Sequence, residues 1–239
     1  MCTVVVRWAP EQPAQILALR DELTTREFDD PGRWWPEHPD VVGGRDRVAG
    51  GTWCANHVGS GATAMVLNRP QKRIADAGAP SRGILPLLAA THEQEWTSYV
   101  DLAGMASFAL VLTTPERLTT WVYDGAELTS VERDAGTHMV TSGGEEDGKA
   151  ERFLADFTAA DFPTGWRAVV ESHAPSDDVA SLVVRHAMGS LVYATVFGQL
   201  IEARPGHLRL EHSRTPWLPG SWVSGSWTPS EHPAERTGG

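Results

Sequence analysis

Short apolar segments, each closed by proline or glycine, recur along this chain and limit what it can fold into. The first two, Thr3–Trp8 and Gln15–Leu19, flank a loop with two prolines and predict a β-hairpin. A second hairpin is predicted for Thr52–His57 and Ala62–Leu67, which flank a glycine-containing turn. The further expected strands are Ser107–Thr113, Leu118–Tyr123, Glu127–Arg133, Thr137–Thr141, Leu191–Ala203 and His207–His212.

Two stretches interrupt this strand pattern. The charged residues Arg20-Asp21-Glu22 follow the second apolar segment directly, so we expect the second strand to end where they begin. The stretch from Asp29 to Asp46 contains three prolines and a Gly-Gly pair, and we expect it to be irregular.

Helical patterns are fewer. Ser81 is a candidate N-cap for a helix over Arg82–Thr91, and Lys149–Ala160 has apolar residues at helical spacing. Many hairpins with few helices predict an α+β protein whose sheets are covered by helices in layers. We expect one domain over residues 1–213 and an extended or disordered tail over 214–239, where the composition turns to Pro, Gly, Ser and Trp without periodicity.

Composition excludes several classes of protein. With 41% hydrophobic residues in 239, the chain can bury a core, and its net charge of -11 argues against nucleic acid as a partner. Charged residues break up the first twenty positions, and no apolar stretch approaches a membrane span, so we expect a cytoplasmic protein without an integral membrane segment. Two cysteines make no disulfide framework, and the nine histidines form no zinc-type pair, so we expect no metal site.

The run from Gly143 to Ala150 nearly matches a phosphate-binding loop. Ala150 stands where a magnesium-binding Ser or Thr is needed, and three acidic residues occupy the loop. Those carboxylates would repel a triphosphate, so we expect an acidic loop before a helix rather than a nucleotide site.

The second residue, Cys2, is a candidate nucleophile. Methionine aminopeptidase removes Met before a small residue, which would leave a thiol and a free α-amine on one carbon. The pKa of the amine is about 8 and that of the thiol about 8.5, so a nearby positive charge can favour the thiolate, which is the nucleophile. From the Met-Cys pair alone, a chance cysteine at a frayed chain end stays open as the alternative.

Aromatic residues suggest a pocket beside this cysteine. Trp34, Trp35 and Trp53 lie near polar strand ends, and with His57 we expect them to line an apolar pocket.

Six short motifs occur together in the first 90 residues and resemble the NRDE family, also called Transport and Golgi organisation protein 2-like. They are Met1-Cys2, Leu19-Arg20-Asp21-Glu22, Gly43-Gly44-Arg45-Asp46, Gly50-Gly51-Thr52-Trp53, Leu67-Asn68-Arg69 and Ser81-Arg82-Gly83. The family's naming motif begins with Asn where this chain has Leu19, so the chain resembles a divergent member.

The resemblance implies a four-layer αββα sandwich of the N-terminal-nucleophile hydrolase type. Its start is similar to cysteine amidases such as bile salt hydrolases and penicillin V acylases, which place an acid 19 residues after the cysteine, the position of Asp21. By that resemblance Cys2 is the nucleophile, Asp21 holds the α-amine, Arg20 favours the thiolate and Asn68 helps to bind an oxyanion.

Because of two departures from the family pattern, two functional hypotheses stay open. Ser142-Gly143 stands where the family has Ser-Asn, and Ala194-Thr195-Val196 stands where it has Gly-Thr-Arg. Loss of one oxyanion donor can reduce a rate by about 10²–10³. One hypothesis is an amidohydrolase or acyltransferase acting on a small amide, ester or thioester without a cofactor. The other is a non-catalytic binding protein in haem or lipid and acyl-CoA trafficking, with haem as a reversible ligand.

Overall fold

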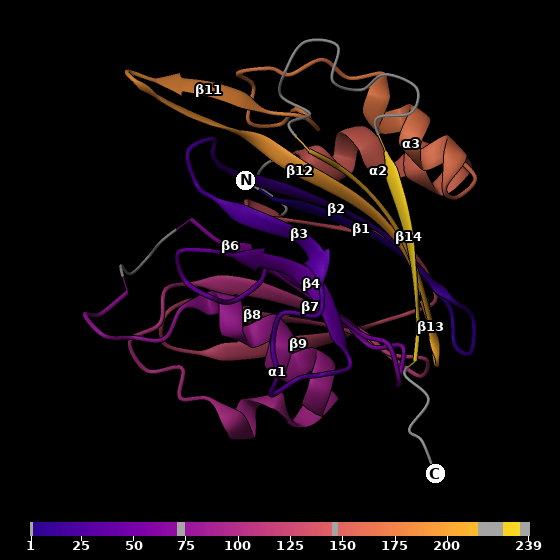
Figure 1. Cartoon of the computed structure of the whole chain (residues 1–239). Helices are drawn as coiled ribbons and strands as arrows, with labels where there is room; N and C mark the ends of the chain where they lie inside the picture. Colours follow the sequence, from indigo (N-terminus) through magenta and orange to yellow (C-terminus); the bar gives the residue numbers. More distant parts are fainter. Residues whose placement is uncertain (1, 71–74, 145–147, 215–226, 235–239) are drawn as a thin grey trace.

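The computed structural model describes residues 2–70, 75–144, 148–214 and 227–234, in which two antiparallel sheets lie face to face (Figure 1). Within the described residues each sheet has seven strands, and every strand pair is antiparallel. The first sheet has the order β10-β1-β2-β12-β13-β14, with β11 paired to β12, and the second runs from β3 to β9 in chain order.

The bounds of the elements are as follows. The first sheet contains β1 (Thr3–Trp8), β2 (Ala14–Leu23), β10 (Gly136–Thr141), β11 (Arg185–Met188), β12 (Leu191–Arg204), β13 (His207–Arg214) and β14 (Thr228–Pro233). The second sheet contains β3 (Phe28–Gly32), β4 (Val41–Asp46), β5 (Cys54–His57), β6 (Thr63–Asn68), β7 (Phe108–Thr113), β8 (Leu118–Tyr123) and β9 (Leu128–Arg133). The helices are η1 (Arg82–Ile84), α1 (Leu85–His92), η2 (Glu93–Tyr99), α2 (Lys149–Ala159) and α3 (Thr164–Glu171).

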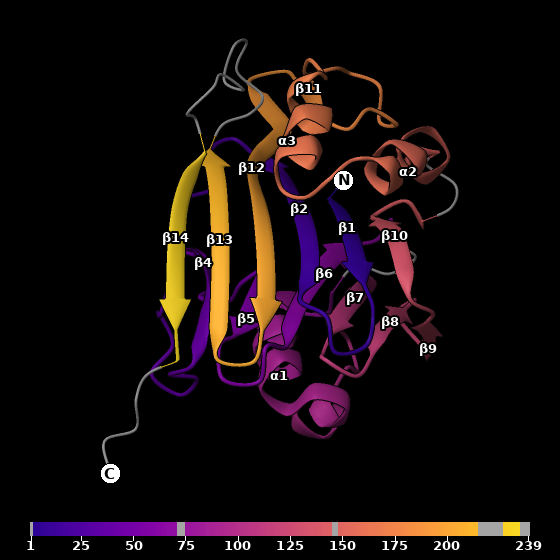
Figure 2. The same ribbon diagram turned by 90° about the vertical axis from the view of Figure 1, so that its right-hand side faces the viewer.

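Three apolar clusters hold these layers together. Alternate residues of β1 and β2, such as Val4 and Ile16, face the second sheet in a shared core. Their neighbours Val5 and Leu17 face the other way and pack against Phe157 of α2, beside α3. A third cluster joins the outer face of the second sheet to α1 and η2, so helices cover both outer faces (Figure 2). The alternation follows from the period of two in a strand.

Most of the predicted strands and helices are confirmed. The two hairpins, the strands from β7 to β10 and the pair β12–β13 lie where the apolar segments predicted them. Ser81 caps η1, because its hydroxyl accepts a hydrogen bond from the backbone of Gly83, and α1 continues from there. The expected α+β class is therefore correct.

Two predictions about β2, β3 and β4 were wrong. The strand β2 does not end before the charges: it continues to Leu23 and contains Arg20 and Asp21, which are both buried. The stretch from Asp29 to Asp46 is not irregular, because it contributes to β3 and β4. Proline is tolerated in β3 since this strand pairs only with β4, at the edge of the sheet.

Other elements had no sequence prediction. These are η2, α3, β11 and β14. The strand β14 lies in the stretch expected as an extended or disordered tail, and Thr228–Pro233 pairs with β13 across six residues, whereas positions 215–226 and 235–239 of that stretch lie outside the described residues. Trp227, just before β14, is 6% exposed and packs in the cluster under α2 and α3. The acidic residues 145–147 of the phosphate-loop-like run lie outside the described residues.

The packing of Trp227 gives the first testable prediction. Trp227→Ala should lower the free energy of unfolding by about 3–5 kcal/mol, because it leaves a cavity in a filled core. Trp34→Ala is the matched control: Trp34 is 37% exposed, and we expect a loss below about 1 kcal/mol. Urea unfolding of both variants measures the difference, and equal losses would contradict the placement of Trp227.

Candidate active site around Cys2

Cys2 lies immediately before β1 and is bound to the end of β10. Its backbone nitrogen donates to Ser142 Oγ at 2.8 Å, and the Ser142 nitrogen donates to the Cys2 carbonyl at 3.1 Å. The Cys2 thiol is directed at the carbonyl oxygen of Asp21, with Sγ and O 3.8 Å apart. In this chain Met1 still precedes Cys2, so the Cys2 nitrogen is an amide.

Arg20 extends between the two sheets on the same side of β2 as the shared core. The β1–β2 register pairs Thr3 with Leu19, so Cys2 stands opposite Arg20 at the end of the ladder. The Arg20 guanidinium lies over the Trp53 ring, with its carbon 4.5 Å from the ring centroid, and Arg20 Nη2 is 3.3 Å from Asp46 Oδ2. A cation is therefore fixed beside the thiol by an aromatic face and a carboxylate.

Glycines make room for this arrangement. A Cβ on Gly44 would lie 2.4 Å from the Trp53 ring, and a Cβ on Gly51 would lie 2.5 Å from the backbone of Gly83. The Thr52 nitrogen donates to the Gly83 carbonyl at 2.8 Å. Close approach therefore explains why glycine stands in the Gly43–Asp46 and Gly50–Trp53 motifs. The contact between Gly51 and Gly83 also brings Arg82, the residue before Gly83, to the cavity.

The Asp46 carboxylate accepts hydrogen bonds from two arginines, Arg20 and Arg26. Its Oδ2 accepts from Arg26 Nε at 2.7 Å as well as from Arg20, and its Oδ1 accepts the backbone nitrogens of Val48 and Ala49. Burial opposes ionisation, but the hydrogen bond from Arg26 and these backbone donors hold the pKa of Asp46 below its usual range.

Asp21 points to the opposite face of β2, toward α2. Thr195 Oγ1 donates to Asp21 Oδ1 at 2.6 Å, and Lys149 Nζ lies 3.9 Å from Asp21 Oδ2. Lys149 is fully buried and also donates to Thr3 Oγ1 at 3.1 Å. The β12 register shifts between Thr195 and Phe197, opposite Asp21 and Arg20, which places a bulge beside the site.

These residues surround one cavity of about 170 Å³, which we call the Cys2 cavity. Its lining residues are Cys2, Arg20, Asp21, Glu22, Arg26, Asp46, Ala49, Thr52, Trp53, Val66, Asn68, Ser81, Arg82 and Gly83. Cys2, Arg20, Asp21 and Asn68, the four candidates from the sequence, are thus brought together from β2, the end of β6 and the residue before β1.

The expected aromatic pocket is only partly present. Trp53 lines the Cys2 cavity, but Trp34, Trp35 and His57 do not. Trp34 stacks on Arg45 at the surface, and the Trp35 indole donates to the Gly50 carbonyl in the outer cluster. His57 Nδ1 is 3.1 Å from Ser60 Oγ in a turn. Three of the four expected residues therefore lie away from the Cys2 cavity, because Trp34 and Trp35 follow β3 in a loop whose contacts lead elsewhere and His57 ends β5 at a turn.

Ionisation of Cys2 is opposed in the Met1-bearing chain. Burial, and then the Asp21 carboxylate, raise the pKa of the Cys2 thiol, while Arg20 acts in the other direction. Burial also lowers the pKa of the Arg82 guanidinium. The thiol is therefore protonated at neutral pH until something adds positive charge beside it.

Sequence reasoning did not identify Lys149, Thr195, Tyr193 or Ser142 as site residues. Tyr193 donates its hydroxyl to the Asp21 carbonyl at 3.0 Å, next to the cysteine sulfur. Lys149 had one usable signal: it is one of only two lysines and starts a predicted helix. The other three are ordinary strand or loop residues, and only the folded register brings them to Asp21 and Cys2.

Over the described ranges no group of three or more His, Cys, Asp or Glu is placed to hold a metal ion. In the same ranges no helix has the length and hydropathy needed to cross a membrane.

The buried pair of Lys149 and Asp21 can be tested by a double-mutant cycle. Lys149→Met or Asp21→Asn alone should cost about 3–5 kcal/mol of unfolding free energy, because each leaves a buried charge without its counterion. The double variant should recover at least about 1 kcal/mol of the summed loss.

Arg152→Met is the control for this cycle. Arg152 lies on the same helix and pairs with Asp178 at 2.7 Å, but both side chains are about half exposed. We expect a loss of about 1 kcal/mol or less. Additive losses for Lys149 and Asp21 would show that the two charges do not interact.

Comparison with known proteins is consistent with the motifs. A family model described as Transport and Golgi organisation 2 matches residues 1–158, about two thirds of the chain. No curated protein matches the sequence significantly.

Proposed function

The chain belongs to the Transport and Golgi organisation 2 family, and from that premise we propose that it is an N-terminal cysteine amidohydrolase or acyltransferase. In this proposal the fold is the four-layer αββα sandwich of N-terminal-nucleophile hydrolases. The observation that carries it is that Cys2, Arg20, Asp21 and Asn68 line one cavity, with the Asp21 carbonyl 3.8 Å from the Cys2 sulfur and the Asp21 carboxylate on the α2 side of β2. The layers of helix, two sheets and helix are compatible with that fold type.

Removal of Met1 is the activating step in this proposal. It replaces the Cys2 amide with an α-ammonium group, which adds a positive charge on the same residue as the thiol. The proposed role of Asp21 is to hold the freed amine, because continuing the β1–β2 register beyond Thr3 and Leu19 puts Asp21 opposite the position that Met1 vacates. Ser142 Oγ, which already accepts the Cys2 nitrogen, would keep the amine oriented.

The reaction then has two halves. The neutral fraction of the α-amine accepts the thiol proton and becomes the ammonium, and the Cys2 sulfur forms a bond to the substrate carbonyl carbon, whose electron pair moves to oxygen. Asn68 and the neighbouring arginines stabilise that oxyanion. The C–N or C–O bond breaks as the ammonium returns its proton to the leaving group, and water or another acyl acceptor then cleaves the thioester.

The cavity favours a small polar substrate. Its volume of about 170 Å³ is smaller than the range of about 300–1,000 Å³ that is usual for drug-sized ligands. A short acyl group fits that space, with the leaving group outside. The alternative, a haem or lipid binding protein without turnover, would need a different surface, since His57 is bonded in its turn at Ser60 away from the Cys2 cavity.

Alkylation kinetics test the state of the thiol. In the Met1-bearing chain the raised pKa of Cys2 should make iodoacetamide react slowly at pH 7, with a rate that rises about tenfold per pH unit. The chain without Met1 should react faster at pH 7. Arg20→Gln should then slow it by about threefold to tenfold, because the cation that favours the thiolate is gone.

Cys54 is the internal control for this experiment. It is fully buried, and burial raises its pKa to about 12, so it should stay unmodified in the folded protein. Intact mass before and after reaction gives both the Met1 state and the number of modified thiols. Equal rates with and without Met1 would overturn the proposed activation.

Asn68→Ala separates acyl transfer from thiol reactivity. Hydrolysis of p-nitrophenyl acetate should fall by about 10²–10³, because an oxyanion donor acts on the transition state. Alkylation of Cys2 should change less than about twofold, since no oxyanion forms in that reaction. A parallel loss of both activities would assign Asn68 to folding of the site instead.

A further inference from the structure

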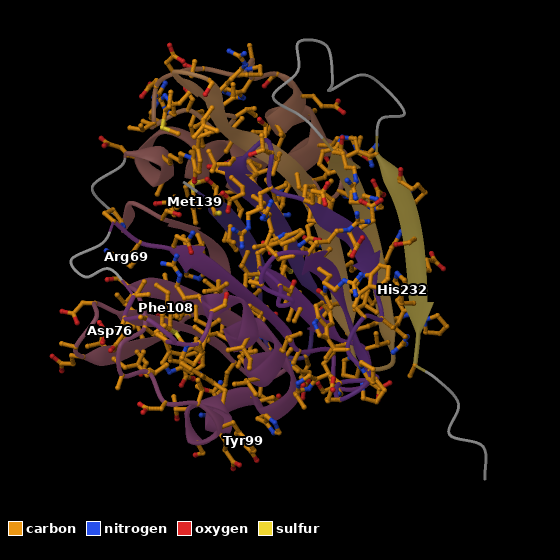
Figure 3. The ribbon with its side chains drawn as sticks, turned by 60° about the vertical axis from the view of Figure 1, so that its left-hand side comes forward. Arg69, Asp76, Tyr99, Phe108, Met139 and His232 are labelled. Atoms are coloured by element: carbon orange, nitrogen blue, oxygen red, sulfur yellow. The ribbon has the colours of Figure 1, made fainter. Side chains whose placement is uncertain are left out.

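A second cavity, of about 590 Å³, lies at the side of the two sheets, next to β9 of one sheet and β10 of the other. β9 pairs only with β8 and β10 only with β1 among the described strands, so both are edge strands. We call it the edge cavity, and its walls come from β8, β9, β10 and α2, with Arg69 at the end of β6. Arg69 and Met139, which both line it, lie on the same side of the molecule (Figure 3).

Two arginines of the edge cavity have no acidic partner among the described residues. Within the described part of the chain, neither Arg69 nor Arg133 forms an ion pair. Arg133 Nε is in addition buried without a hydrogen-bond partner. The protein has 31 acidic and only 20 basic side chains, so two arginines left unpaired in one cavity are unexpected. Guanidinium groups of this kind bind carboxylate and phosphate oxygens.

A buried hydroxyl points to the same conclusion. Thr120 is 4% exposed and lines the edge cavity, yet its Oγ1 has no hydrogen-bond partner in the part of the chain that the structure describes. A buried polar group without a partner costs free energy, and such groups in native proteins need an explanation. An acceptor oxygen of a bound molecule would satisfy this hydroxyl.

The remaining walls are apolar. Val122 and Val140 face each other from the two sheets at the edge of the shared core, and Leu154 of α2 covers the cavity from outside. These side chains would enclose a compact apolar group while the arginines bind charge. The volume lies within the usual range for small-molecule sites, about 300–1,000 Å³.

We propose that the edge cavity binds a small organic oxyanion, a carboxylate or a phosphate monoester with a compact apolar group. Arg69 and Arg133 bind its oxygens, Thr120 donates its hydroxyl, and Val122 and Val140 enclose the apolar part. This site is distinct from the Cys2 cavity, and it does not depend on the proposed function. Asn68 lines one cavity and Arg69 the other, so the end of β6 separates the two.

Calorimetric titration with phenyl phosphate, benzoate and the neutral benzyl alcohol tests the proposal on the full-length chain. At least one oxyanion should bind saturably with one site, benzyl alcohol should bind at least tenfold more weakly, and the better oxyanion identifies the head group. Arg69→Gln and Arg133→Gln should each weaken binding by about tenfold or more. Arg117→Gln, which removes an exposed arginine at the turn before β8, should leave it unchanged.

Thr120→Val distinguishes a ligand contact from a structural role. The variant keeps the shape but removes a hydroxyl that has no partner, so stability should be unchanged or higher while oxyanion affinity falls. Cys2→Ala should bind as the parent chain does, which separates the outcome from that of the proposed enzyme. Absence of saturable binding by both oxyanions, wild-type affinity in both arginine variants, or loss of binding in Cys2→Ala would each overturn the proposal.

Discussion

The alternation of Arg20 and Asp21 along β2 is the constraint on which the site depends. Consecutive strand residues point to opposite faces, so Arg20 enters the space between the sheets and Asp21 faces α2. Because β2 pairs with β1 on one side and β12 on the other, it joins Cys2 to Thr195 and Tyr193. A one-residue slip of β2 would exchange the two faces and dismantle the site.

Both charges are buried, and each is compensated by groups distant in sequence. Arg20 has Asp46 and the Trp53 ring, and Asp21 has Lys149 and Thr195. A buried charge without such partners would cost several kcal/mol, so these contacts are required for the strand to continue through the charged run. Burial raises the pKa of the Cys2 thiol as well.

The sequence predicted the strands well wherever apolar residues alternate or run between turns, as in β1 and β8. It failed at β2, because charges normally end a strand and their partners, Asp46 and Lys149, are not visible from local pattern. It failed at β3 because the three prolines of this stretch suggest irregular chain, although only Pro31 lies in β3 and an edge strand tolerates it. Cys2 was a candidate from its place behind Met1, but Arg20, Asp21 and Asn68 were named only through motif resemblance. Trp34 and Trp35 show that proximity in sequence does not place side chains in one pocket.

If Cys2 is the nucleophile, it must carry an acyl group during turnover. Brief incubation with p-nitrophenyl acetate, acid quenching and intact-mass analysis with peptide mapping measure this directly. The account predicts a chain that lacks Met1 and gains the mass of one acetyl group on Cys2, and no such adduct in Cys2→Ala. Retention of Met1 together with acetyl groups only on lysines or the N-terminal amine would contradict it.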